Sequence, residues 1–256
     1  DTLDPLPLDN TVTTWGTDPN AITCPTGTTS TGTGYCELPS QISSDLTLTA
    51  GNAYLLNGVV TVGNGNEPLA STNELASGAA LQNVTLTIEA GVNVYGKTNT
   101  GAVLIITRGS QIVANGTESN PITFSGEDEG FDGIEEFGGL VLQGFSGEPN
   151  NGALGEFGGV TAGVFDDNDS SGQLQYVRVT ETGEELDALD GGGTHLSSGI
   201  EFHGVGTGTV VNNIQVHTGR WDGVEIRGGA VNAKHLVLTK ILDASIKIQD
   251  EYQGNL

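Results

Sequence analysis

The sequence predicts an all-β fold, a right-handed parallel β-helix: a solenoid of about 22 residues per coil that follows an irregular, disulfide-pinned N-terminal segment. Two observations carry this prediction, the composition of the chain and the spacing of its short apolar runs. The 256 residues include 40 Gly and no Met, and only 16% are charged, which suits short strands joined by tight turns. The glycines follow no G-X-Y period, which excludes a collagen-like chain.

Residues 1–45 are predicted to form an N-terminal cap or arm. Prolines interrupt any regular element in this segment, at Pro5, Pro7, Pro19, Pro25 and Pro39. Cys24 and Cys36 are twelve positions apart with neither a His nor a third Cys near them, so a local disulfide is favoured over a zinc site. A disulfide implies an oxidising compartment.

Residues 46–256 are predicted to form the β-helix domain. Short runs with alternating apolar residues recur through this part of the chain, and Gly and Asn bound them, which is a strand signal. The runs begin at Leu46, Val84, Val103, Ile122, Leu140, Val177, Ile200, Ile214, Val224 and Ile246.

The spacing of the later runs is the stronger observation. Ile200, Val224 and Ile246 recur at nearly equal intervals, and each opens a triplet whose first and third residues should face inward. A second series, Ile214 and Leu236, lies between them with the same interval of about 22 residues. Two interleaved series with one period indicate a coil with several strands per turn, whereas a β-sandwich would require the spacing to be coincidental.

Several runs in this domain are specific in combination. They are residues 107–117, 121–124, 138–144, 204–211, 222–229 and 231–239. Together they resemble a family of exported bacterial parallel β-helix proteins, often lipoproteins, of mostly unassigned function. The resemblance covers about residues 46–256. It implies the fold and an exported location, but no mechanism.

The chain departs from this family's pattern at two places. Similar proteins usually carry Asp-Asp pairs near the positions of Trp221-Asp222 and Asp243-Ala244, where this chain has one Asp each. An acidic site shared with the family is therefore not implied there. Similar proteins also continue past the stretch that ends here at Leu256, so the C-terminal coil is expected to be truncated or uncapped.

The formal net charge is −24, from 32 Asp and Glu against 8 Lys and Arg. Such a surface repels nucleic acid and anionic lipid and attracts cations, or simply keeps the protein soluble in salt. We expect no nucleic-acid partner, and a secreted or cell-surface bacterial protein from a saline environment. The chain begins at Asp1 without Met and lacks any apolar run long enough to span a bilayer, so a mature exported chain without a transmembrane segment is expected.

Two polar columns are predicted on the outer side of one sheet. One column contains Glu201, Glu225 and Lys247, and its neighbour contains His203, Arg227 and Gln249, in coils about 4.8 Å apart. Mixed polar ladders suit contact with an extended polysaccharide, whereas the alternative is a solvated face whose salt bridges contribute little. The predicted ligand-binding residues are His203, Arg220, Trp221, Glu225, Arg227 and Lys247.

Two insertions, residues 126–137 and 180–198, are rich in carboxylates and are expected to form a wall beside this face. The floor beside the wall is expected to contain His217, Arg220, Trp221 and Asp222. So much negative charge at one edge favours bound cations, so Ca²⁺ is the predicted cofactor.

The loop at residues 167–172 resembles the first half of a calcium loop. Arg178 replaces the Glu expected at its twelfth position, so the loop is not an EF-hand, and an Asx-rich turn is the alternative. The candidate metal ligands, from this loop and from the second insertion, are Asp167, Asp169, Ser171, Glu184 and Asp187.

Two classes of function stay open. The first is an exported surface or extracellular module that is structural, adhesive or polysaccharide-binding, and that associates with calcium and stacks end to end into a homo-oligomer or filament. The second is a polysaccharide lyase or glycoside hydrolase, whose candidate catalytic residues are Glu201, Glu225, Arg227 and Asp222. The sequence contains no nucleophile elbow, phosphate loop or zinc-protease motif, which favours the module.

Overall fold

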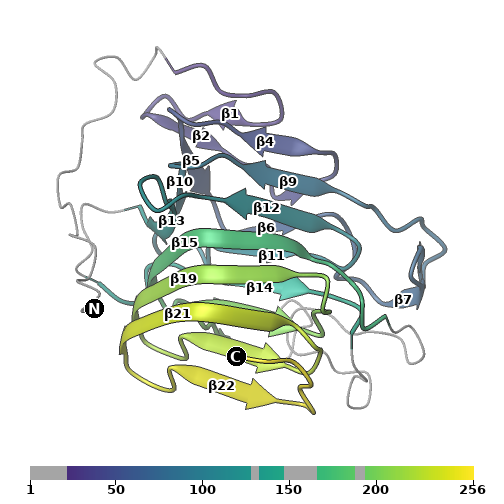
Figure 1. The fold of residues 1–256 in the computed structure, drawn as a ribbon. Coiled ribbons are helices and arrows are strands. Elements are labelled where there is room, and N and C mark those ends of the chain that lie inside the picture. Colours follow the sequence, from purple (N-terminus) through teal and green to yellow (C-terminus); the bar gives the residue numbers. More distant parts are fainter. Residues whose placement is uncertain (1–21, 128–132, 147–165, 188–193) are drawn as a thin grey trace.

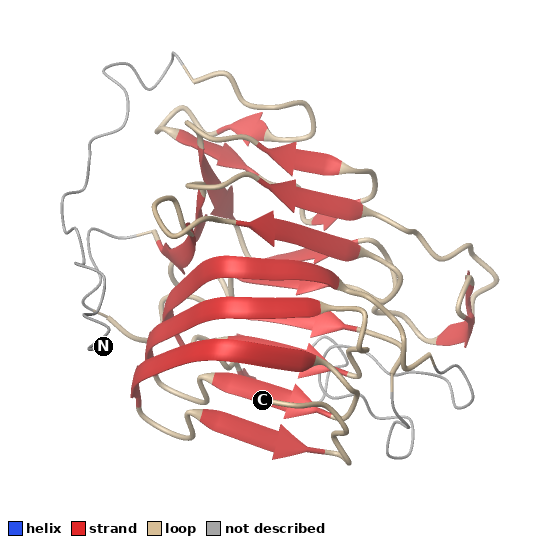
Figure 2. Cartoon of the chain, in the orientation of Figure 1, coloured by secondary structure: helices blue, strands red, loops and turns tan. Residues whose placement is uncertain are grey.

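The computed structural model describes residues 22–127, 133–146, 166–187 and 194–256. Within these ranges every regular element is a β-strand, and strands and their connections account for the whole fold (Figure 2). No helix in these ranges is long and apolar enough to cross a membrane. The strands stack coil on coil, from the N-terminal coils at the top of Figure 1 to β21 and β22 at the bottom.

Each coil passes through three strand faces in turn, and all the pairings between successive coils are parallel. The first face is formed by β4 (Leu46–Leu48), β9 (Thr85–Ile88), β12 (Gln111–Asn115) and the first halves of β15 (Gly172–Thr182), β19 (Val210–Gly219) and β21 (Asn232–Ile241). The second face is formed by β2 (Tyr35–Glu37), β5 (Ala53–Leu56), β10 (Asn93–Gly96), β13 (Ile122–Gly126) and the second halves of β15, β19 and β21. The third face is formed by β3 (Gln41–Ile42), β6 (Val59–Val62), β11 (Val103–Ile106), β14 (Leu140–Gln143), β18 (Ile200–His203), β20 (Val224–Arg227) and β22 (Ile246–Gln249).

Both predicted series of strands pair in the predicted register. Ile200 aligns with Val224 and Val224 with Ile246 on the third face. Ile214 aligns with Leu236 on the second face. The parallel β-helix predicted from the spacing is therefore confirmed, and the β-sandwich alternative is excluded.

A single residue turns the chain from the first face to the second inside each of the three long strands. These residues are Tyr176, Asn213 and His235, whose φ angles are 49°, 54° and 55°. Left-handed backbone at one position bends a strand sharply without breaking the pairing on either side. Because the three bends are in register, the two faces keep one angle along the stack.

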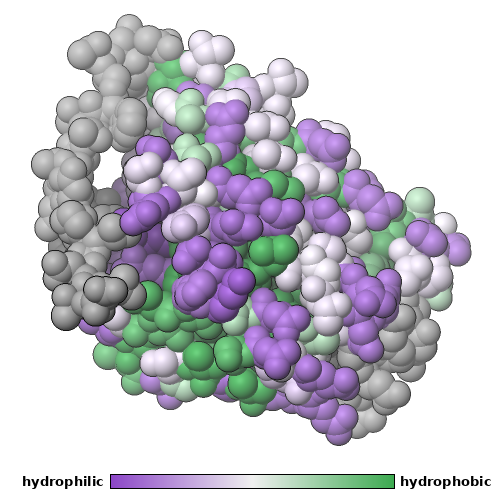
Figure 3. Space-filling model, in the orientation of Figure 1, coloured by the Kyte–Doolittle hydropathy of each residue, from purple (hydrophilic) through white to green (hydrophobic). Residues whose placement is uncertain are grey.

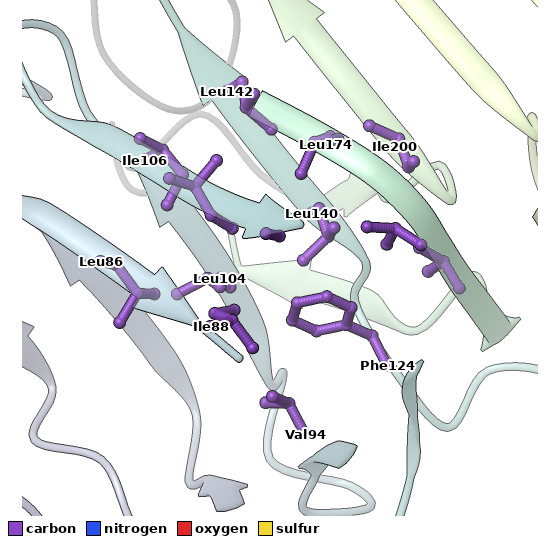
Figure 4. Close-up of a cluster of buried hydrophobic side chains, with 14 of the residues drawn as sticks. Leu86, Ile88, Val94, Leu104, Ile106, Phe124, Leu140, Leu142, Leu174 and Ile200 are labelled. Carbon is purple, nitrogen blue, oxygen red and sulfur yellow. The ribbon is translucent and has the colours of Figure 1, made fainter. Parts of the chain in front are cut away.

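Inward-facing aliphatic and aromatic side chains fill the interior between the faces (Figure 4). Leu104, Phe124, Leu140 and Leu142 are among those that are almost completely buried. Burial of each such side chain contributes about 1.5–3 kcal/mol. Stacked layers of this kind are the reason that the strand register persists from coil to coil.

The predicted disulfide joins Cys24 to Cys36, close to the first coil. Cys36 lies in β2, which pairs with β5, and β1 (Thr29–Ser30) pairs antiparallel with β2. Strand pairing thus begins within the segment expected to be a cap or arm, and residues 1–21 lie outside the described residues. The disulfide ties the segment before β1 to the closed N-terminal end of the core.

Two antiparallel hairpins project from the coils. β7 (Leu69–Ser71) and β8 (Glu74–Leu75) form one, and Leu69 and Leu75 pack into a small separate apolar cluster. β16 (Glu185–Asp187) and β17 (Thr194–Leu196) form the other, within the predicted second insertion. Leu186 of β16 packs against Val103, Ile105 and Val141 on the outer side of the third face.

Candidate functional site

The predicted polar columns exist on the outer side of the third face. Glu201, Glu225 and Lys247 align in one column across β18, β20 and β22. His203 and Arg227 align in the adjacent column. The register predicted for these side chains is therefore correct.

Their exposure differs from the prediction of a solvent-facing ladder. The side chains of Glu201 and His203 are 0% exposed, and Glu225 is 1% exposed. Ser198, just before β18, donates its backbone N–H to Glu201 Oε1 at 2.9 Å and its hydroxyl to Glu225 Oε2 at 3.1 Å. The expectation that these residues contact a polymer directly is therefore corrected: they form a buried network.

Glu225 lies at the centre of the network. Its Oε1 accepts hydrogen bonds from Arg227 Nε at 2.8 Å and from Gln249 Nε2 at 2.8 Å, and Lys247 Nζ lies 3.2 Å away. Its Oε2 accepts the Ser198 hydroxyl. One buried carboxylate therefore orients side chains from two successive strands and from the segment before β18.

Asp222 extends the network toward the corner before β20. Its Oδ1 accepts the backbone N–H of Ala244 at 3.1 Å, and Lys247 Nζ is 3.2 Å from its Oδ2. Burial alone lowers the pKa of Lys247, but the nearby carboxylates of Glu225 and Asp222 outweigh it and raise this pKa above its ordinary value. The side chain of Lys247 is 40% exposed, and its ammonium group lies between two buried acids.

Glu201 is paired with His203. His203 Nε2 lies 2.9 Å from Glu201 Oε2, and both side chains are fully buried. With Ser198 on its other oxygen, Glu201 accepts a hydrogen bond at each oxygen. All the carboxylate oxygens of Asp222, Glu201 and Glu225 thus have donors.

The predicted acidic wall meets the predicted floor at Arg220. Its guanidinium forms an ion pair with Glu135 from the first insertion and lies 3.7 Å from Glu185 of the second. The same guanidinium lies 4.8 Å from the centroid of the Trp221 ring, a cation–π contact. Arg220 therefore links both insertions to the corner before β20, and it covers one face of the indole of Trp221, one of the predicted ligand-binding residues.

The predicted calcium loop is held by hydrogen bonds within the protein. Asp169 Oδ2 accepts the backbone N–H of Phe145 at 3.2 Å, and burial raises the pKa of Asp169 to about 6. Asp167 Oδ1 accepts a serine hydroxyl at 2.8 Å. Ser171 donates its hydroxyl to the carbonyl of Gln143 at 3.0 Å.

The other candidate metal ligands lie in the second insertion. Glu184 accepts the backbone N–H groups of Gly101 and Ala102, at 2.8 and 3.2 Å, so both its oxygens tie the insertion to an earlier coil. The side chain of Asp187 lies outside the described residues. No group of three or more Asp, Glu, His or Cys side chains among the described residues is arranged to hold a metal ion, and calcium stays a prediction.

Sequence reasoning missed one member of the network, Ser198. Ser198 and Gln249 each donate to Glu225, from the segment before β18 and from the last strand of the third face. Gln249 was predicted to continue the column of His203 and Arg227, and the strand register confirms this position. Ser198 carries no such signal because it lies in an irregular segment.

Residues 40–256 match a family model described as a pectate-lyase-like β-helix domain. No curated protein and no solved structure matches the chain.

Proposed function

The chain belongs to the pectate-lyase-like β-helix family, and from this premise we propose that it is an extracellular module that binds polysaccharide without cleaving it. The single observation that carries the proposal concerns the carboxylates of Asp222, Glu201 and Glu225 on the outer side of the third face. Each of their oxygens already has a hydrogen-bond or ion-pair donor from the protein.

A glycoside hydrolase needs one carboxylic acid that can deliver a proton and a second carboxylate that acts as base or nucleophile. Asp222, Glu201 and Glu225 are all buried, and donors from the protein occupy every one of their oxygens. Carboxylates held in this way position their partners. The partners held in position here are the partly exposed cations of Arg227 and Lys247.

The groups available to a ligand lie along the edge of the network. Lys247 and Arg227 are partly exposed and are held by Glu225, and Arg220 with Trp221 borders them at the corner. Fixed ammonium and guanidinium groups bind hydroxyl and carboxylate oxygens of sugars at little entropic cost because their side chains are already ordered. We assign these four residues to ligand binding, with His203 and Glu225 as the buried supports.

Calcium and an exported location are parts of the same proposal. The chain has 32 acidic residues against 8 basic ones, and a disulfide closes its N-terminal end. The first feature favours association with cations and the second an oxidising compartment. The loop that holds Asp167, Asp169 and Ser171 is the calcium site that we propose.

Self-association is the structural part of the proposal. In the last coil the inward-facing Ile246 and Ile248 are exposed, and Leu242 beside them is 68% exposed (Figure 3 shows hydrophobic residues gathered at this lower end). At the opposite end, Leu46 and Leu48 are buried. We propose that these exposed apolar side chains mediate end-to-end pairing with a second copy of the chain.

A polysaccharide lyase or glycoside hydrolase is the alternative, and the family description favours it in one respect. A lyase uses a basic side chain to take a proton beside a uronate carboxylate, and Lys247 and Arg227 are basic groups at the candidate site. A raised pKa keeps Lys247 protonated, which opposes that role.

The test is incubation of the whole chain with a panel of acidic and neutral polysaccharides, with and without calcium. Both retention on the glycan and release of shorter or unsaturated products are measured. We expect retention without products, weakened about tenfold by Lys247→Ala through loss of a charged hydrogen bond. Lys234→Ala, a matched exposed lysine on the first face, is the control and leaves retention unchanged.

Products that disappear in a Glu225→Gln variant would show that the protein is an enzyme. Absence of retention on every glycan would also overturn the proposal.

A further inference from the structure

The outer side of the second face carries a group of basic side chains that the proposed function does not use. Thr180, His217 and Thr239 form one outward column across β15, β19 and β21. Arg178 belongs to the neighbouring column, one coil before His217, and Lys240 follows Thr239 one coil after it. His217 therefore lies between two cations.

The His217 side chain is almost completely buried, and only one of its ring nitrogens has a partner. Its Nδ1 lies 2.7 Å from the hydroxyl of Thr239. Its Nε2 is buried and has no hydrogen-bond partner. A buried polar nitrogen without a partner is unfavourable, so such an atom points to a missing ligand group.

The two cations lack acidic partners among the described residues. Arg178 donates Nε to Gln215 Oε1 at 3.0 Å, and neither Arg178 nor Lys240 forms an ion pair there. This is unusual in a chain where acidic residues outnumber basic ones by 32 to 8. By contrast, Arg220 and Lys247 each contact two carboxylates.

The electrostatic surroundings of His217 agree with this geometry. Burial, and then the positive charges of Lys240 and Arg178, lower its pKa. The nearest acid along β15, Glu181, is engaged by the Ser125 hydroxyl. The charged groups around Nε2 are therefore positive.

We propose that His217, Arg178 and Lys240 form an oxyanion site on the outer side of the second face, which takes sulfate-ester or carboxylate groups of an acidic polysaccharide. With Nδ1 accepting the Thr239 hydroxyl, Nε2–H donates to the anion, and the two cations neutralise its charge. The anion site itself does not depend on the proposed polysaccharide binding, and only its assignment to a glycan rests on that function.

The test is an NMR titration of the histidine ring nitrogens in the whole chain. The probes are sodium sulfate, sodium galacturonate, a sulfated polysaccharide and a polyuronate, with sodium chloride at matched ionic strength and neutral dextran as controls. We expect saturable shifts of the His217 ring signals, and a rise in its pKa, with the anionic probes only.

Variants distinguish the site from general screening. Arg178→Gln and Lys240→Gln each weaken the binding of the anions about tenfold, whereas Lys234→Gln leaves it unchanged. Both substitutions are at partly or fully exposed side chains, so folding is retained. His217→Gln removes the ring signals that report binding in the NMR titration. This variant is therefore tested separately, by the expected loss of its retention on the acidic glycan.

The outcomes separate the two proposals. No saturable shift beyond that of chloride, or unchanged affinity in both variants, overturns the site. Shifts with free sulfate and galacturonate but with neither polymer overturn its assignment to a glycan. Retention of glycans that none of these variants weakens leaves the proposed function intact and overturns the role of this site in it.

Discussion

Glu225 is the residue on which the polar network of the third face depends. It accepts hydrogen bonds from Arg227, Gln249 and Ser198 and pairs with Lys247, although its own side chain is almost completely buried. A buried carboxylate with several charge-assisted donors holds its partners rigidly, and it becomes costly when one of the charges is removed.

We expect Glu225→Gln to lower the free energy of unfolding by about 2–4 kcal/mol, because Arg227 and Lys247 lose their shared negative partner. Urea unfolding followed by circular dichroism measures the loss. The matched control is Glu118→Gln, an exposed glutamate, which should change stability by less than about 0.5 kcal/mol. Equal effects of the two substitutions would contradict the structural role of Glu225.

His217 makes a pH-dependent contribution that can be isolated in the anion-free protein. Burial, Lys240 and Arg178 hold the pKa of His217 below its ordinary value of about 6.5 in the folded state. As pH falls through 6.5, the unfolded chain binds the proton first, so the folded state loses stability.

Wild type should therefore lose more stability than His217→Gln between pH 7.5 and pH 5, in a buffer without sulfate or phosphate. The measurement is the difference between their free energies of unfolding at the two pH values. A difference that does not change with pH would show that the environment of His217 does not disfavour its charged form. Sulfate should reduce the difference by stabilising the protonated ring.

At the scale of elements, the β16–β17 hairpin determines which part of the third face is accessible. Leu186 packs on the outer surface of that sheet, and Glu184 anchors the start of the insertion to the backbone of Gly101 and Ala102. Burial raises the pKa of Glu184. The hairpin thus converts an outward strand surface into a partly buried one.

Glu184→Ala should detach the hairpin locally, because two backbone N–H groups lose their acceptor at a cost of about 1–3 kcal/mol each. Hydrogen exchange at Leu186 measures the opening, and exchange should rise there while the strands of the core stay protected. Glu185→Ala serves as control. The neighbouring Glu185 side chain is half exposed and lies 3.7 Å from Arg220, whereas Glu184 holds the backbone of the earlier coil. Uniform loss of protection across the core would mean that Glu184 stabilises the whole fold.

At the scale of the whole molecule, the two ends of the solenoid differ. The N-terminal end is closed by the segment that the disulfide holds, and Leu48 there is 1% exposed. In the last coil Ile248 is 50% exposed. An exposed apolar end with unpaired strand edges favours pairing with a second copy.

We expect the protein to form dimers at high concentration through the exposed apolar side chains of this coil. Analytical ultracentrifugation gives the dissociation constant. Ile248→Lys, which places a charge in the proposed contact, should weaken dimerisation at least tenfold. Thr47→Lys on the first face is the control, and a persistent monomer would overturn this proposal.

The sequence by itself determined the solenoid, its register and the disulfide. The spacing of Ile200, Val224 and Ile246 repeats once per coil, and local alternation places their neighbours on the outer side. These features were open to prediction because strand periodicity and coil length are local properties of the chain.

Only the tertiary structure decided which outward residues are buried and which cations lack partners. Glu201 occupies an outward position of its strand and yet is fully buried, and the alternation of apolar residues does not predict this burial. Arg178, His217 and Lys240 come together from three successive coils, and the absence of acids beside them among the described residues of so acidic a chain appears only once the coils are stacked. Burial and charge pairing are sums over neighbours distant in sequence, and packing decides them.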